Sequence, residues 1–158
     1  MKKGREYFAA EDVSGIEFDW EYYIPSFSPE EIYSPGALKR YRHGICLDTL
    51  MKLQRFRDYV NRARGCGLLV NFGNHKRRGV RTAQDQVEIV KKFGGARDSM
   101  HVAGRAFDIT MSKRHDTYWL GKSAVDFGWT GVGFYPTFVH VDTRTCFDGQ
   151  AVIWDKMS

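Results

Sequence analysis

Three side chains in the second half of the chain have the types and the spacing of a metal site. Asp108 follows His101 by seven residues, and His140 follows Asp108 by a further 32. Two imidazoles and one carboxylate are a common ligand set for a catalytic zinc ion, and three protein ligands leave one coordination position open. We therefore predict that His101, Asp108 and His140 bind zinc and support hydrolytic chemistry.

Two predicted strands bring these residues together. Alternation in residues 105–111 places Asp108 on one strand face, while the opposite face is apolar. The same alternation in residues 131–144 places His140 and Asp142 on a shared face. The two strands can thus present a carboxylate and an imidazole to the same point, and the first histidine arrives from the turn before the first strand.

Helices and a short strand are predicted upstream of the site. Apolar residues recur at helical spacing over residues 48–63, with Asp48 as the cap and Gly65 as the end of the helix. Residues 68–72 are typical of a short buried strand, and residues 82–93 are predicted to form a second helix. These elements are expected to support the two ligand-bearing strands.

A basic loop, residues 73–81, separates the short strand from the second helix. Five of the seven residues 75–81 are Lys, Arg or His. Such a loop can dock an anionic substrate group, because arginine can hold a carboxylate through two parallel hydrogen bonds. The alternative is an exposed basic loop without a binding role.

The first 36 residues are aromatic and acidic, and prolines interrupt them. Proline removes a backbone donor and restricts the residue before it, so no long regular element is expected here. Ser28 followed by Pro29 is typical of a short helix start. We expect this segment to wrap over a core formed by residues 45–145, within a single domain of residues 1–158.

The composition is that of a globular protein. Of 158 residues, 42% are hydrophobic and 15% aromatic, which suffices for a core of its own. The net charge of +5 favours a polyanionic neighbour such as nucleic acid, an anionic membrane surface or a bacterial wall polymer, or it serves solubility alone. Three cysteines without a C-x-x-C pair indicate neither a disulfide framework nor a thiolate zinc site. His43, His75 and His115 lack a comparable context and are interpreted as structural.

Three motifs carry a resemblance to a known family. Residues 99–109, S-M-H-V-A-G-R-A-F-D-I, resemble the S-x-H-x-x-G-x-A-x-D-I signature of the zinc D-alanyl-D-alanine carboxypeptidases and related peptidoglycan peptidases. Residues 131–144, G-V-G-F-Y-P-T-F-V-H-V-D-T-R, are similar to the second signature of this group, and residues 78–81, R-G-V-R, are similar to its Ser-Gly-Tyr-Arg. The resemblance covers residues 45–145, and the family shares its fold with the hedgehog signalling domain and lysostaphin.

The resemblance implies a fold and a reaction. The fold is α+β, with helices packed on one side of a small antiparallel sheet and a metal cleft on the other. The cofactor is Zn²⁺, and the reaction is hydrolysis of a peptide bond in the peptidoglycan stem peptide or cross-bridge by metal-activated water. Such an enzyme is a D,D-carboxypeptidase or an endopeptidase.

The resemblance also implies roles for residues outside the ligand set. Arg81 would grip the substrate carboxylate, and Arg78, which stands where the family has serine, competes for that role. Ser99 and Tyr135, within the two signatures, complete the predicted substrate-binding set.

The general base of the family is missing from its two usual places. Many members carry a catalytic histidine two residues before the last ligand or a glutamate three before it, where this chain has Phe138 and Thr137. Asp142 is the nearest acidic candidate and, with Arg81, the predicted catalytic residue. It either accepts the proton of water or orients His140, and the orienting role is favoured.

Other classes of protein share parts of this pattern. An iron(II) oxygenase uses an H-x-D pair like His140 and Asp142, but it takes a further histidine downstream and none follows here. A non-catalytic, metal-bearing wall-binding or interaction domain keeps the ligands and loses the base, so the missing base favours this alternative. Nucleic-acid binding lacks a recognisable motif and is not expected.

No stretch of the sequence is apolar enough for a signal peptide or a membrane span. We therefore expect synthesis in the cytoplasm, no stable membrane insertion, and action on the bacterial cell wall. A wall peptidase of this kind is typical of a bacteriophage endolysin or a virion-associated lysin.

Overall fold

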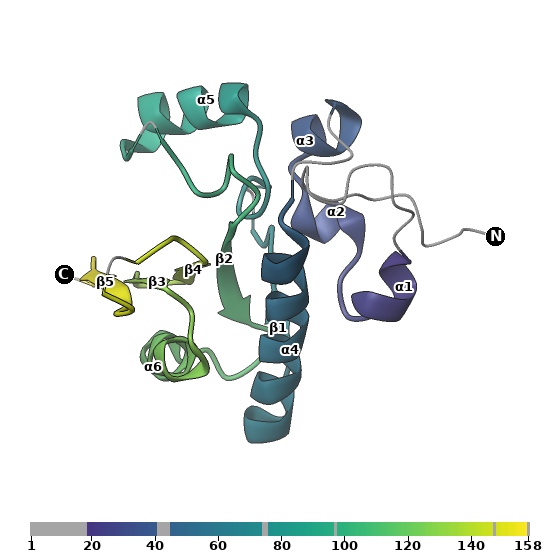
Figure 1. Cartoon of the computed structure of the whole chain (residues 1–158), viewed down its shortest axis with the longest axis vertical. Coiled ribbons are helices and arrows are strands. Elements are labelled where there is room, and N and C mark those ends of the chain that lie inside the picture. Colours follow the sequence, from purple (N-terminus) through teal and green to yellow (C-terminus); the bar gives the residue numbers. More distant parts are fainter. Residues whose placement is uncertain (1–18, 41–44, 74–75, 97, 147, 158) are drawn as a thin grey trace.

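The computed structural model describes residues 19–40, 45–73, 76–96, 98–146 and 148–157 (Figure 1). No helix among these residues is long and apolar enough to cross a membrane. The elements in chain order are α1 (Trp20–Tyr23), α2 (Pro29–Ile32), α3 (Pro35–Arg40), α4 (Leu47–Arg64), β1 (Leu68–Leu69), α5 (Ala83–Phe93), β2 (Ala106–Met111), α6 (Thr117–Phe127), β3 (Gly131–Phe134), β4 (Val139–Asp142) and β5 (Val152–Asp155).

The five strands form one sheet in the order β1-β2-β4-β3-β5. Three of the strand pairs are antiparallel, but β5 pairs with β3 in parallel. The predicted α+β class is confirmed, whereas the sheet is mixed and not antiparallel throughout. The reason is that Asp142, which ends β4, lies opposite Gly131, which begins β3. The chain that leaves β4 is therefore close to the first residue of β3. The later strand β5 then pairs with the free edge of β3 and runs in the same direction as β3.

The apolar core lies between one face of the sheet and the helices α4 and α6. The two helices meet where Phe56 of α4 contacts Phe127 of α6, with ring centroids 5.0 Å apart. Helix α5 departs from the prediction that the helices pack on one side, because its residues Gln86 and Ile89 line the cleft that holds the predicted metal ligands. The fully buried sheet residues that face α4 and α6 are Phe107, Ile109, Val132, Val139 and Val141.

The main helix begins one residue earlier than predicted. Cys46 and not Asp48 occupies the N-cap position of α4, because the Cys46 N–H donates to the Gly104 carbonyl at 2.9 Å and holds Cys46 extended. Asp48 lies in the first turn, where its charge still favours the positive end of the helix dipole. Gly65 ends the helix in the left-handed conformation, as predicted, with φ of 67°.

Two further predicted elements are present, one of them shortened. Helix α5 begins after Thr82, whose side chain accepts from the Asp85 N–H in a capping box. Strand β1 ends at Leu69 instead of residue 72, because Asn71 has a left-handed backbone with φ of 56° and cannot continue a strand.

The described part of the N-terminal segment packs on the core as three short helices. Ser28 caps α2, as predicted, and the Trp20 indole N–H donates to the Phe27 carbonyl at 2.7 Å. The Val80 N–H donates to the Ile32 carbonyl at 2.8 Å, so this segment is tied to the loop that precedes α5. Residues 1–18 and the predicted structural histidines His43 and His75 lie outside the described residues, while His115 contacts the Thr110 hydroxyl at 3.2 Å.

Glycine in β3 makes room on the ligand-bearing face of the sheet. Gly133 lies between His140 of β4 and Trp154 of β5 in one row across the sheet. A Cβ at position 133 would collide with the Trp154 indole, and a Cβ at Gly131 would collide with the Asp142 carboxylate. The two glycines therefore allow an indole and a carboxylate to lie over the middle of the sheet.

The Gly133→Ala substitution tests this close approach. We expect it to lower the free energy of unfolding by about 1–3 kcal/mol, because the added methyl group must displace Trp154. Urea denaturation measures the change. Gly67→Ala is the matched control, since a Cβ there meets only the mobile end of the Arg57 side chain, and equal stability of the two variants would contradict the account.

Candidate metal centre

Three different segments supply the predicted ligands. Asp108 of β2 and His140 of β4 are direct partners in the antiparallel register, so their side chains lie side by side on one face. His101 comes from the turn before β2, where its N–H donates to the Ser99 hydroxyl at 3.2 Å and its carbonyl accepts from the Gly104 N–H at 3.2 Å. The structure thus brings the three predicted ligands together.

The donor atoms of the three side chains have the separations of a coordination site. The Nε2 of His101 lies 3.2 Å from the Oδ1 of Asp108 and 3.2 Å from the Nδ1 of His140. The same Nδ1 lies 3.0 Å from the Oδ1 of Asp108. Neighbouring donors around a tetrahedral zinc ion are about 3.3 Å apart when the bonds are about 2.0–2.1 Å. The cluster therefore fits such an ion without rearrangement.

The outer nitrogens of both histidines are already occupied. The Nδ1 of His101 lies 2.8 Å from the Gly79 carbonyl, to which it donates, and the Nε2 of His140 lies 2.9 Å from the Asp142 carboxylate. A neutral imidazole that donates from one nitrogen presents a lone pair at the other. Both remaining lone pairs therefore point at the centre, which is the arrangement that supporting hydrogen bonds give to metal-binding histidines.

The comparisons with known proteins agree with this geometry. Residues 79–142 match the model of the family described as Peptidase M15, and all three ligands lie within that segment. The match confirms the resemblance to the M15 peptidases. No curated protein sequence matches the chain. The match supports a metallopeptidase, and the cluster of His101, Asp108 and His140 within the matched segment could hold its metal ion.

Asp142 lies on the outer side of His140. Its carboxylate accepts from the Nε2 of His140 and from Arg144, whose Nε lies 2.9 Å from Oδ1 and whose backbone N lies 3.1 Å from it. Burial alone would raise the pKa of Asp142, but the hydrogen bonds from Arg144 and His140 outweigh it and hold the pKa well below the usual range. A carboxylate so occupied is suited to orienting His140, the favoured one of its two predicted roles.

Arg81 supports the predicted metal ligand Asp108 in the same way. Its Nη2 lies 3.3 Å from the Oδ2 of Asp108, and its Nη1 lies 2.9 Å from the Oε1 of Gln86. Burial would raise the pKa of Asp108, but its contacts with His101 and His140 outweigh burial and hold the pKa far below its usual range. Asp108 is therefore ionised, as a metal ligand must be.

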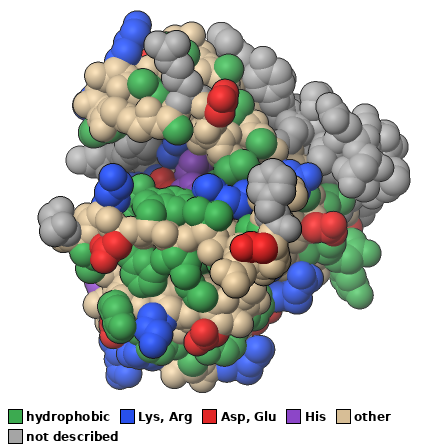
Figure 2. All heavy atoms as spheres, turned by 60° about the vertical axis from the view of Figure 1, so that its left-hand side comes forward, with side chains coloured by type: hydrophobic (Ala, Val, Ile, Leu, Met, Phe, Trp, Pro, Cys, Tyr) green, Lys and Arg blue, Asp and Glu red, His purple; other side chains and the backbone are tan. Residues whose placement is uncertain are grey.

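The predicted substrate-binding residues line one cleft of about 920 Å³ together with the metal ligands. Figure 2 shows a hollow with histidine at its bottom and Lys and Arg side chains beside it. Ser99 and Arg78 both line this cleft, and Tyr135 stacks on Phe138 with ring centroids 4.4 Å apart. The cleft therefore combines cationic and aromatic walls above the donor cluster.

Sequence reasoning missed two contributors to the cleft, Trp154 and Gln86. The Trp154 indole N–H donates to the Tyr135 hydroxyl at 3.1 Å, and its ring centroid lies 5.2 Å from that of His140. The run Val152–Ile153–Trp154 is typical of a strand and could have signalled β5. Gln86 carried no comparable signal, because its role depends on Arg81 lying next to it.

The Asp142→Asn substitution separates the two roles of this residue. We expect zinc affinity to fall about 10- to 100-fold, because the amide lacks the charge that pairs with Arg144 and with His140. Competition with a chromogenic zinc chelator measures the affinity. Asp126→Asn, at an exposed position of α6, is the control, and unchanged affinity with loss of hydrolysis would instead assign the proton-accepting role to Asp142.

Proposed function

We propose that the protein is a zinc-dependent peptidoglycan peptidase that hydrolyses a peptide bond of the stem peptide or the cross-bridge, as a D,D-carboxypeptidase or an endopeptidase. The observation that carries the proposal is the donor cluster: three ligand atoms 3.0–3.2 Å apart, with the outer nitrogens of both histidines already hydrogen-bonded. The match to the Peptidase M15 model supports the reaction class.

Zinc and the surrounding side chains would have different roles in the reaction. Zinc held by His101, Asp108 and His140 would supply Lewis acidity and lower the pKa of water, so no protein nucleophile is needed. Asp142 keeps His140 in the tautomer with Nδ1 free, and Arg81 holds the second oxygen of Asp108. The cationic and aromatic cleft walls bind and orient the peptide.

The proposal extends to the biological setting. The net charge of +5 suits a surface rich in anionic polymers, such as the bacterial wall. Neither nucleic acid nor a membrane is part of the proposed function. Action on the cell wall as a bacteriophage endolysin or virion-associated lysin is the setting we propose.

A second function is favoured by one observation. Both oxygens of Asp142 are engaged by His140 and Arg144, and Phe138 and Thr137 occupy the family's usual positions for the base. A metal-bearing protein without a free base at these positions suits a non-catalytic wall-binding or interaction domain. Binding to peptidoglycan without release of products would select this function.

The His101→Ala substitution tests the proposed function. We expect the zinc-loaded parent to contain about one zinc per chain and to release products from purified peptidoglycan, identified by mass spectrometry. The variant should lose both the zinc and the hydrolysis, because two protein ligands hold zinc poorly. The His115→Ala variant should keep both.

Two results would contradict the proposal. Hydrolysis that persists in His101→Ala would show that the chemistry lies elsewhere. A zinc-loaded parent that binds peptidoglycan without cleaving it would replace the enzyme with the binding domain.

A further inference from the structure

Arg78 has an environment unlike that of Arg81 and Arg144, the other two arginines that line the cleft. Its guanidinium carbon lies 4.0 Å from the ring centroid of Phe72 and 5.0 Å from that of Phe138. Its Nε is buried and has no hydrogen-bond partner among the described residues. Leaving a buried charged donor without an acceptor is costly. The guanidinium is thus held by two aromatic rings and retains an unused donor.

Arg81, in contrast, has all three nitrogens engaged by the protein. Its Nε donates to the Arg77 carbonyl, its Nη1 to Gln86 and its Nη2 to Asp108. The side chain is also buried, so Arg81 offers little accessible surface to a substrate carboxylate. The sequence favoured Arg81 as the residue that grips the substrate, but these contacts suit it to holding Asp108.

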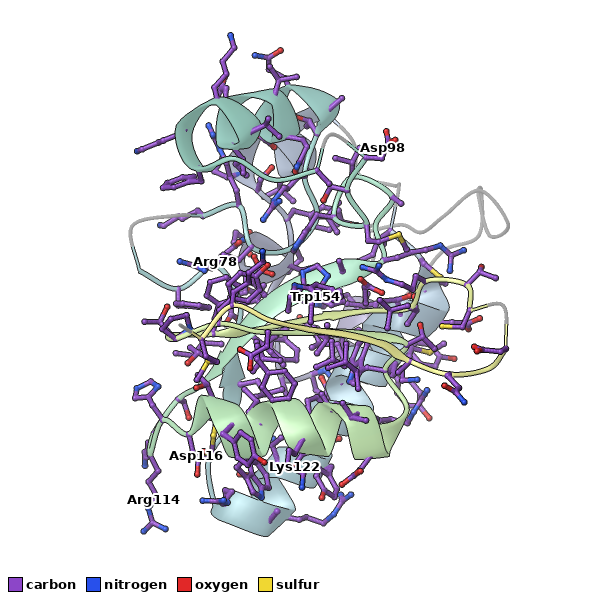
Figure 3. The ribbon with its side chains drawn as sticks, turned by 90° about the vertical axis from the view of Figure 1, so that its left-hand side faces the viewer. Arg78, Asp98, Arg114, Asp116, Lys122 and Trp154 are labelled. Atoms are coloured by element: carbon purple, nitrogen blue, oxygen red, sulfur yellow. The ribbon has the colours of Figure 1, made fainter. Side chains whose placement is uncertain are left out.

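The position of Arg78 is fixed next to the metal ligands. Its carbonyl accepts from the Asp108 N–H at 2.6 Å, and its side chain lines the same cleft as His101 and His140. Figure 3 shows Arg78 on the same side of the sheet as Trp154, whereas Lys122 of α6 lies on the opposite side. Burial lowers the pKa of Arg78 and the charge of Asp108 opposes this shift, but an arginine remains charged near neutral pH.

We propose that Arg78 is the specificity-determining residue of the cleft and binds a free carboxylate of the substrate near the scissile bond. A planar guanidinium packed against two aromatic rings has already lost part of its conformational freedom, so little more is lost on binding. It can hold a carboxylate through two parallel hydrogen bonds. This inference rests on the proposed function for the identity of the substrate.

The test uses one stem peptide ending in D-alanyl-D-alanine in several synthetic forms. The terminal carboxylate and the internal acidic side chain are each left free or converted to the amide, which removes the charge at almost constant shape. Hydrolysis by the zinc-loaded chain gives kcat and KM, and calorimetry gives the affinity of the metal-free chain for each form. We expect the parent to favour one acid form over its amide by about 10- to 100-fold in kcat/KM, mainly through KM.

Three variants test whether Arg78 causes the preference for the acid form over the amide. Arg78→Gln should reduce the acid-to-amide ratio to near one, with little change for the amide. Arg78→Lys, which keeps the charge and loses the fork, should retain part of the ratio and guards against misfolding of the first variant. Lys122→Gln removes the same charge on the far side of α6 and should leave the ratio as in the parent.

The role of Arg78 and the proposed hydrolysis can fail independently in these experiments. If no peptide is hydrolysed, yet the metal-free parent binds the acid form more tightly and Arg78→Gln does not, the role of Arg78 stands and the proposed hydrolysis fails. Peptides that are hydrolysed or bound with the same acid-to-amide ratio by the parent and by Arg78→Gln would overturn the role of Arg78.

Discussion

The register between β2 and β4 is the constraint on which the rest of the site depends. It places Asp108 directly opposite His140, and the alternation of the strands then turns Phe107, Ile109, Val139 and Val141 into the core. A slip of one residue would exchange these faces, burying the donors among apolar side chains. The apolar packing against α4 and α6 therefore fixes the face that carries the donor cluster as strictly as it fixes the core.

Buried charge is tolerated at this face because each charged group has a partner. Asp108 is held by Arg81 and both histidines, and Asp142, which is fully buried, is held by Arg144 and His140. Removing one member of such a set leaves an unpaired buried charge, which costs several kcal/mol. The network thus links the stability of the sheet to the orientation of the ligands, and only Arg78 in the cleft keeps an unused buried donor among the described residues.

Local patterns in the sequence were sufficient to predict much of the fold. Alternation predicted the faces of β2 and β4, the apolar pattern of residues 82–93 predicted α5, and Gly65 predicted the end of α4. The pattern of residues 152–154 is typical of a strand, but the parallel pairing of β5 with β3 could not be predicted, because a local pattern does not say which strand a segment pairs with. The different roles of Arg78 and Arg81 could not be predicted either. They depend on the contact of Arg78 with Phe138, which is distant in the sequence, and on the contact of Arg81 with Gln86 of α5. Arg78 and Phe138, both departures from the motifs of the related peptidases, contact each other in the fold.

The most direct test of the metal centre is the position of a bound ion in crystals of the zinc-loaded protein, located by anomalous scattering at the zinc absorption edge. The account predicts one peak at about 2.0–2.2 Å from the Nε2 of His101, the Oδ1 of Asp108 and the Nδ1 of His140. It also predicts that the Nε2 of His140 still contacts Asp142. The absence of a peak between these three side chains, or coordination through the Nε2 of His140, would contradict it.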